Sequence, residues 1–140
     1  MLDHKKSVLF ICKNNASRSQ MAECLLKNNY GDKYDVYSCG SDPKEVSPLT
    51  IEVMAEIGID ISDQFVTHLE EYQGWKFDYV VTLCEDKNCP VFWEAKKYIH
   101  HEFKDPKTYS KGNMKKIEIF RIIRDEIKDW IENSFINSID

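Results

Sequence analysis

A cysteine and an arginine six positions apart are the pair of residues in this 140-residue chain best suited to covalent chemistry. Cys12 is followed by Lys13, Asn14, Asn15, Ala16 and Ser17, and then by Arg18 and Ser19. A loop of this length that runs into a helix turns successive backbone N–H groups toward one point, and a guanidinium adds a planar fork of donors. The segment therefore predicts that residues 13–18 bind a tetrahedral oxyanion. A positive environment also favours the thiolate, which is the nucleophilic form of cysteine, and Ser19 is placed to donate a hydrogen bond to it.

Strands and helices that would position this loop are expected to alternate along the chain. Hydrophobic, β-favouring runs predict strands at residues 7–11, 35–38, 78–83 and 98–103. Apolar residues at helical spacing predict helices at residues 18–29, 48–58 and 113–135. We expect Ser17 to cap the first helix, with Gln20 as its capping-box partner.

This succession is typical of an α/β fold with a parallel sheet covered by helices on both faces. In such folds ligands bind beyond the carboxyl ends of the strands. Two of the predicted strands end in cysteine, Cys12 and Cys84, so we expect both sulfurs at that edge.

Composition restricts the class of protein further. The 42% of hydrophobic residues is too high for a disordered chain, and the net charge of −5 argues against a general nucleic-acid binder. No apolar run approaches the length of a membrane span or of a signal peptide. We expect one domain over residues 1–140, monomeric and cytoplasmic. In such a compartment the five cysteines do not indicate a disulfide framework, and their odd number leaves at least one thiol free.

Several motifs resemble the low-molecular-weight protein tyrosine phosphatase family, and specifically its thioredoxin-coupled arsenate reductase branch. They are Val8-Leu9-Phe10-Ile11-Cys12, Arg18-Ser19-Gln20-Met21-Ala22-Glu23, Ser38-Cys39-Gly40, Val46-Ser47-Pro48, Gly58-Ile59-Asp60-Ile61-Ser62, Val80-Val81-Thr82-Leu83-Cys84, Cys89-Pro90 and Asp105-Pro106. The resemblance covers roughly residues 7–135 and implies a four-stranded parallel sheet flanked by helices. Asn14 stands where these loops usually carry glycine. If the loop needs a positive φ, we expect it at Asn14, because asparagine tolerates that conformation. Cys39 replaces the usual alanine, and residues 85–88 form a shorter segment than is typical.

The resemblance also implies a redox relay. Cys12 would attack arsenate while Asp105 protonates the leaving oxygen, Cys84 would then attack Cys12 and release arsenite, and Cys89 would attack Cys84. Thioredoxin or a similar dithiol protein would reduce the resulting disulfide. Some members of the branch bind potassium at positions that match Asn15, Glu23 and Ser38; otherwise no tightly bound cofactor is expected.

Other functions stay open at this point. A phosphatase acting through a phosphocysteine on Cys12 needs only Arg18 and Asp105 besides, and would leave Cys84 and Cys89 as bystanders. A zinc site of Cys84, Cys89 and His100 or His101 lacks a recognisable four-ligand spacing. A third hypothesis is a non-catalytic module that binds anions or senses redox changes. Cys24 is expected to pack in the first helix, and no role is assigned to Cys39.

Overall fold

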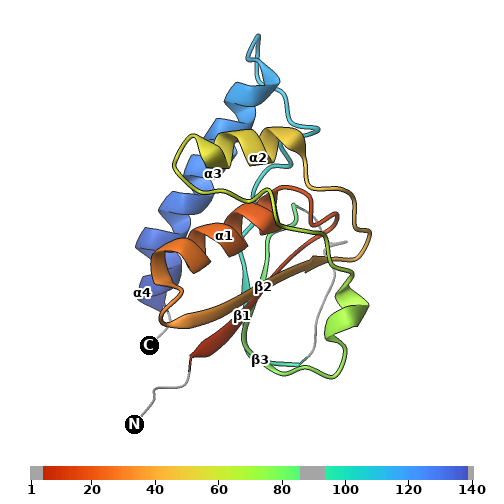
Figure 1. Cartoon of the computed structure of the whole chain (residues 1–140), viewed down its shortest axis with the longest axis vertical. Helices are drawn as coiled ribbons and strands as arrows, with labels where there is room; N and C mark the ends of the chain where they lie inside the picture. Colours follow the sequence, from red (N-terminus) through yellow and green to blue (C-terminus); the bar gives the residue numbers. More distant parts are fainter. Residues whose placement is uncertain (1–4, 86–93, 139–140) are drawn as a thin grey trace.

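The computed structural model describes residues 5–85 and 94–138, which form a four-stranded sheet in the order β2-β1-β3-β4 (Figure 1). The strands are β1 (Lys6–Cys12), β2 (Tyr34–Gly40), β3 (Phe77–Thr82) and β4 (Ala95–His100). Every neighbouring pair is parallel, as predicted, so the carboxyl ends of all four strands meet at one edge. The central strand β1 delivers Cys12 to that edge, and Cys84 follows β3 there.

The α-helices gather on one face of the sheet (Figure 1). They are α1 (Arg18–Tyr30), α2 (Pro48–Ala55) and α3 (Lys116–Trp130), and α3 continues through the π-helical turn η2 (Ile131–Phe135) into α4 (Ile136–Ser138). Side chains that alternate along β1, Val8 and Phe10, are buried with Leu25, Met54 and Phe120 from the three helices. Burial of this apolar face is the main stabilising contribution to the fold. None of the described helices is long and apolar enough to cross a membrane.

The opposite face has a thinner cover. Leu9 and Ile11, the other alternating side chains of β1, pack with Val80 against the single turn η1 (Leu69–Tyr72). Four aromatic rings close this side by edge and stacked contacts: Tyr37, Tyr72, Trp75 and Phe77. Helical elements thus lie on both faces, as predicted, but all the described α-helices share one of them.

The predicted elements are all present, with shifted ends. The fourth strand begins three residues earlier than predicted and ends at His100, because it is an edge strand that opens with exposed Lys96 and Lys97. Charged residues prevent an edge strand from pairing with another chain, but they also interrupt the apolar pattern by which strands are predicted. The last helix begins at Lys116 rather than at residue 113. The helix predicted over residues 48–58 ends at Ala55, and Gly58 follows in the subsequent turn with a φ of 82°.

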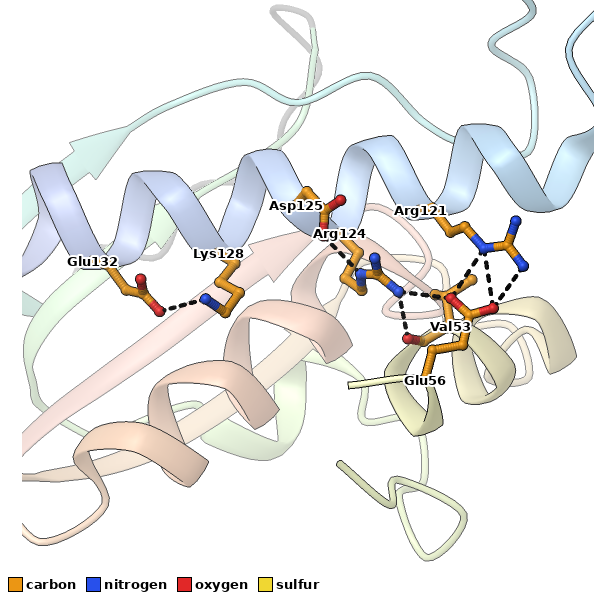
Figure 2. A network of polar contacts seen from close by, with 7 residues as sticks. All are labelled: Val53, Glu56, Arg121, Arg124, Asp125, Lys128 and Glu132. Carbon is orange, nitrogen blue, oxygen red and sulfur yellow. Dashed lines mark hydrogen bonds and ion pairs between the residues drawn. The ribbon is translucent and has the colours of Figure 1, made fainter. Parts of the chain in front are cut away.

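An ion-pair network joins the end of α2 to α3 (Figure 2). Glu56 accepts hydrogen bonds from Arg121 Nε and Nη2 and from Arg124 Nη1, and Arg124 Nη1 also donates to the Val53 carbonyl, at 2.8 Å. The Arg121 hydrogen bond is the largest influence on Glu56 and holds its carboxyl pKa below the ordinary 4.5. Arg124 is buried and also bonds Asp125. The network therefore fixes the two helices relative to each other.

Candidate active site

The loop of residues 12–18, called the anion loop below, connects β1 to α1 and turns its carbonyl oxygens outward. Each of four consecutive carbonyls accepts a hydrogen bond from outside the loop: Lys13 from Asp42 N, Asn14 from Lys44 N, Asn15 from Gln20 Nε2 and Ala16 from Ser47 N. In a trans peptide the C=O of one residue and the N–H of the next point in opposite directions. The N–H groups of residues 14–17 therefore point to the inner side of the loop, which is the arrangement an oxyanion needs.

A small cavity lies on that inner side. It is lined by Cys12, Asn14, Ala16, Ser17, Arg18, Asp105 and Lys107, and its volume of about 10 Å³ is close to the space of one water molecule. The predicted nucleophile Cys12, four of the six residues predicted to bind the oxyanion and the predicted acid Asp105 thus meet in one place, whereas Lys13 and Asn15 do not line the cavity. Lys107 was not predicted, because only its closeness to Asp105 in the sequence could have indicated it. We call this cavity the anion pocket.

Asn15, rather than Asn14, holds the left-handed conformation in the loop, with a φ of 52°, so the expectation for Asn14 is wrong. The Asn15 side chain is fully buried; its Oδ1 accepts from Thr67 N at 2.9 Å, and its Nδ2 donates to Ser19 Oγ at 2.7 Å and to Ser38 Oγ at 2.9 Å. A backbone N–H can only donate, so the amide orientation is fixed. These three buried contacts tie the Asn15 side chain to α1, to β2 and to the segment that contains Thr67.

The network around Asn15 allows Ser19 to donate a hydrogen bond to Cys12. Ser19 Oγ lies 2.9 Å from Cys12 Sγ, and both residues are buried. Because Ser19 Oγ already accepts from Asn15 Nδ2, its own hydroxyl hydrogen is free to point at the sulfur. The arrangement therefore suits stabilisation of a thiolate on Cys12, in agreement with the role predicted for Ser19.

The predicted capping box at the start of α1 is absent. Ser17 is the N-cap residue, but its side chain caps no N–H; its Oγ accepts from Thr50 Oγ1 at 3.0 Å. Gln20 instead donates to the Asn15 carbonyl and to the Phe65 carbonyl. The prediction is wrong because both side chains are buried, and long-range partners replace the local ones. Gln20 and Thr50 are thus loop supports that local sequence rules did not identify.

Gly40, at the end of β2, is a further support that the sequence analysis missed. A Cβ at Gly40 would lie 2.5 Å from the Lys13 carbonyl oxygen and 2.9 Å from Asn15 N. Both neighbours are backbone atoms of the anion loop, which cannot move aside as a flexible side chain can. The close approach of β2 to the loop therefore requires glycine at this position.

Arg18 and Asp105 face each other across the anion pocket. The guanidinium is buried, donates from Nη1 to the Phe103 carbonyl at 3.1 Å and lies 3.7 Å from Asp105 Oδ2 through Nη2. Asp105 Oδ1 accepts from Lys107 N at 3.0 Å, so the carboxylate is held at the start of a turn. An anion bound to the loop would contact Arg18, with Asp105 close enough to exchange a proton with it.

The cysteines divide into two groups. Cys12, Cys24 and Cys39 are free and buried, while Cys84 is buried and takes part in a disulfide. Burial raises the pKa of Cys24 to about 12 and likewise raises that of Cys39, so both are poor nucleophiles at neutral pH. Cys89 lies outside the described residues, and the predicted exchange with Cys84 stays a prediction.

The zinc alternative also depends partly on Cys89. Over residues 5–85 and 94–138 no three His, Cys, Asp or Glu side chains are arranged to hold a metal ion. His100 Nδ1 lies 2.7 Å from Thr82 Oγ1, and His101 stacks on Trp130 with ring centroids 5.0 Å apart. The two histidines therefore have other partners in this structure.

The residues expected to bind potassium lie together, but their arrangement does not fit the ion. Asn15 Nδ2 donates to Ser38 Oγ, Ser38 Oγ donates to Glu23 Oε1 at 2.6 Å, and Lys27 Nζ donates to Glu23 Oε2 at 2.8 Å. Asn15 turns an NH2 group, which cannot ligate a cation, toward the other two residues. The Lys27 ammonium already supplies the positive charge beside Glu23.

Comparisons with known proteins identify the family of the chain. The family model for low molecular weight phosphotyrosine protein phosphatase matches residues 7–139. A protein from Staphylococcus epidermidis named arsenate reductase 2 is 42% identical over 133 residues, 92% of this chain and 95% of its own. A solved structure described as an arsenate reductase in the phosphate binding state has a TM-score of 0.78 at 34% identity and covers 96% of this chain and 99% of its own. A thioredoxin-dependent arsenate reductase from Corynebacterium glutamicum has a TM-score of 0.69 at 32% identity and covers 98% of this chain and 65% of its own. The chain belongs to the low molecular weight phosphotyrosine protein phosphatase family.

Proposed function

We propose that this protein is an arsenate reductase, which reduces arsenate to arsenite with electrons from its own thiols. The observation that carries the proposal is a second sulfur beside the first: Cys12 ends the central strand at the anion pocket, and Cys84 follows the neighbouring strand β3 and is disulfide-bonded. Phosphate-ester hydrolysis has no use for that second sulfur. The similar proteins named above carry the name arsenate reductase.

The first step would form a bond between Cys12 sulfur and arsenic. The loop N–H groups and Arg18 would hold the arsenate oxygens, and Ser19 would stabilise the attacking thiolate. Asp105 would protonate the departing oxygen, which leaves as water. The product is a thioester-like adduct of Cys12 with pentavalent arsenic.

The following steps would move two electrons to arsenic. Cys84 thiolate attacks the Cys12 sulfur, so that a disulfide forms between them, the S–As bond breaks with its electron pair on arsenic, and arsenite leaves. Cys89 thiolate then attacks Cys84 and returns Cys12 as a thiolate. Thioredoxin or a similar dithiol protein reduces the remaining Cys84–Cys89 disulfide.

A single-turnover reaction tests the proposal without the natural donor. Fully reduced protein is mixed with stoichiometric arsenate, quenched by alkylation, and its disulfides are mapped by mass spectrometry while released arsenite is measured. We expect one arsenite per chain and a Cys84–Cys89 disulfide. Cys84→Ser should release none, whereas the matched control Cys24→Ser, which removes a buried thiol of α1, should behave as wild type. Arsenite release by Cys84→Ser at the wild-type rate would exclude the relay.

The phosphatase alternative uses the same pocket and predicts the reverse pattern. Cys84→Ser would then hydrolyse aryl phosphates at the wild-type rate, and wild type would leave arsenate intact with all thiols free. The family membership favours this as the second candidate.

We also propose that the Lys27 ammonium, rather than potassium, neutralises Glu23. Burial lowers the pKa of Lys27, but the hydrogen bond and charge of Glu23 outweigh burial and leave that pKa raised, so the ammonium persists. The melting temperature of wild type should be the same in KCl and NaCl of equal ionic strength, whereas Lys27→Met should be stabilised by KCl. A stabilisation of wild type that is specific to potassium would contradict this proposal.

A further inference from the structure

Glu85 directly follows Cys84 and bonds to the loop that carries the proposed acid. Its Oε1 accepts a hydrogen bond from the backbone N–H of Asp105 at 2.5 Å, and its Oε2 lies 3.7 Å from Lys104 Nζ. Neither the family motifs nor the proposed relay assigns Glu85 a role. A carboxylate oxygen, like the oxygen of a side-chain amide, can accept a backbone hydrogen bond.

The segment around Asp105 is attached on both sides of that residue: Phe103 N donates to the Leu83 carbonyl at 3.1 Å, and Lys116 Nζ donates to the carbonyls of Lys107 and Tyr109. Within the turn, Asp105 Oδ1 accepts from Lys107 N at 3.0 Å, and the Asp105 carbonyl accepts from Thr108 N and Tyr109 N. Those bonds set the shape of the turn but do not place it against the sheet. Asp105 itself contacts other segments through the Arg18 ion pair at 3.7 Å and the Glu85 hydrogen bond. Only the second of these holds the backbone.

We infer that Glu85 is a positioning residue that holds the Asp105 carboxylate at the anion pocket through the Asp105 backbone N–H. This inference deepens the proposed function, since it rests on Asp105 acting as the acid. General acid catalysis depends on hydrogen-bond reach to the departing oxygen, so a small displacement of the loop weakens it. Because Glu85 is bonded through the chain to Cys84, the inference also links the position of the acid to the second cysteine of the relay.

Two kinds of variant separate the hydrogen bond from the ion pair. Glu85→Gln keeps the Oε1 acceptor and loses the charge, and Lys104→Met removes only the ion-pair partner. Glu85→Ala removes the acceptor. Glu102→Ala is the matched control, because Glu102 is an exposed glutamate in the same segment, three positions before Asp105.

The experiment measures how each variant depends on the leaving group. Reduced full-length protein is assayed with phenyl phosphate, whose phenolate must be protonated to leave, and with 2,4-dinitrophenyl phosphate, whose phenolate leaves without help. Glu85→Ala should slow the first by about tenfold and the second by less than about twofold, while Glu85→Gln, Lys104→Met and Glu102→Ala should match wild type. Asp105→Asn is the reference and should show the same pattern with a larger loss. Amide exchange of Asp105 N–H, followed by NMR, should be faster in Glu85→Ala alone.

Each outcome decides a different point. If Asp105→Asn shows the leaving-group pattern and Glu85→Ala does not, the role of Glu85 is overturned while the acid assignment stands. If Asp105→Asn shows no such pattern, Asp105 is not the acid and both statements fall. An equal loss with both substrates in Glu85→Ala would indicate a general structural defect and overturn the positioning role. A wild-type chain inert toward aryl phosphates and arsenate alike would overturn the proposed function itself.

Discussion

The amide of Asn15 determines which hydrogen bonds the two serines beside it can make. Its Oδ1 is committed to Thr67 N, so its NH2 group must face Ser19 and Ser38. This leaves the Ser19 hydroxyl hydrogen for Cys12. A fully buried asparagine side chain thus helps to orient the serine that contacts the nucleophile.

Asn15→Asp should therefore damage both stability and chemistry. The new carboxylate cannot donate to either serine and would draw the Ser19 hydrogen away from the sulfur. We expect a loss of about 1–3 kcal/mol in the free energy of unfolding, measured in urea, and a fall in single-turnover arsenate reduction. Asn28→Asp, an exposed asparagine on α1, is the control and should change stability by less than about 0.5 kcal/mol. Equal losses in the two variants would contradict this role.

The buried thiols provide a second prediction at this scale. Burial raises the pKa of Cys24 to about 12 and raises that of Cys39, and the thiol form does not react with iodoacetamide. At pH 8 both should be alkylated at least about a hundredfold more slowly in the folded reduced protein than in urea. Isotope-coded alkylation with mass spectrometry gives the two rates for each cysteine. Rapid labelling of either thiol in the folded state would show that it is open to the relay.

At the scale of elements, the contact between α2 and α3 is separable from the active site. Arg124 satisfies the Val53 carbonyl near the end of α2, and it shares Glu56 with Arg121 (Figure 2). Arg124→Met should cost about 1–3 kcal/mol in the free energy of unfolding, because a buried carbonyl loses its partner. Lys128→Met, which breaks only the exposed pair with Glu132, should cost less than about 1 kcal/mol. Arsenate turnover at low temperature should be unchanged in both.

The same network gives a pH dependence. The folded-state pKa of Glu56 is below its ordinary 4.5, chiefly through the hydrogen bond from Arg121. Its contribution to stability is therefore fully present above pH 4.5 and is lost as the pH falls through the lowered value. The stability difference between wild type and Glu56→Gln, measured by urea unfolding, should shrink as the pH is lowered below 4.5. A difference that stays constant into that range would show that the carboxylate charge is not involved.

At the scale of the whole molecule, a bound anion should stabilise the entire fold. The anion loop joins β1 to α1, so an oxyanion that binds there binds only the folded chain. Phosphate at a hundred times its dissociation constant should add about 2.7 kcal/mol to the free energy of unfolding, seen as a rise in melting temperature. Arg18→Lys, which keeps the charge and loses the planar fork, should lose most of that rise. An equal rise in sodium chloride of matched ionic strength would point to screening instead.

The architecture could be predicted from the sequence because apolar residues recur at regular spacings in the strands and helices. The alternation along β1 and the three- and four-residue steps of α3 are visible without a structure. The errors lie where distant segments meet. Asn15, Ser17 and Gln20 take their partners from residues 38–67, and no local rule can weigh such partners against a nearby cap or glycine. Glu85 was missed for the same reason, since its partner is twenty positions away.

The stacking of His101 on Trp130 gives the molecule an optical property. Indole fluorescence is quenched when a neighbouring imidazole gains a proton. Burial, with a smaller contribution from His100, holds the pKa of His101 below its ordinary 6.5, so the imidazole stacked on Trp130 is neutral at physiological pH. His101 is followed two residues later by Phe103, whose ring also meets Trp130 and whose carbonyl accepts from Arg18. Phe103 therefore links the Arg18 guanidinium to the Trp130 indole, and we expect the intrinsic fluorescence of the protein to change when an oxyanion binds at Arg18.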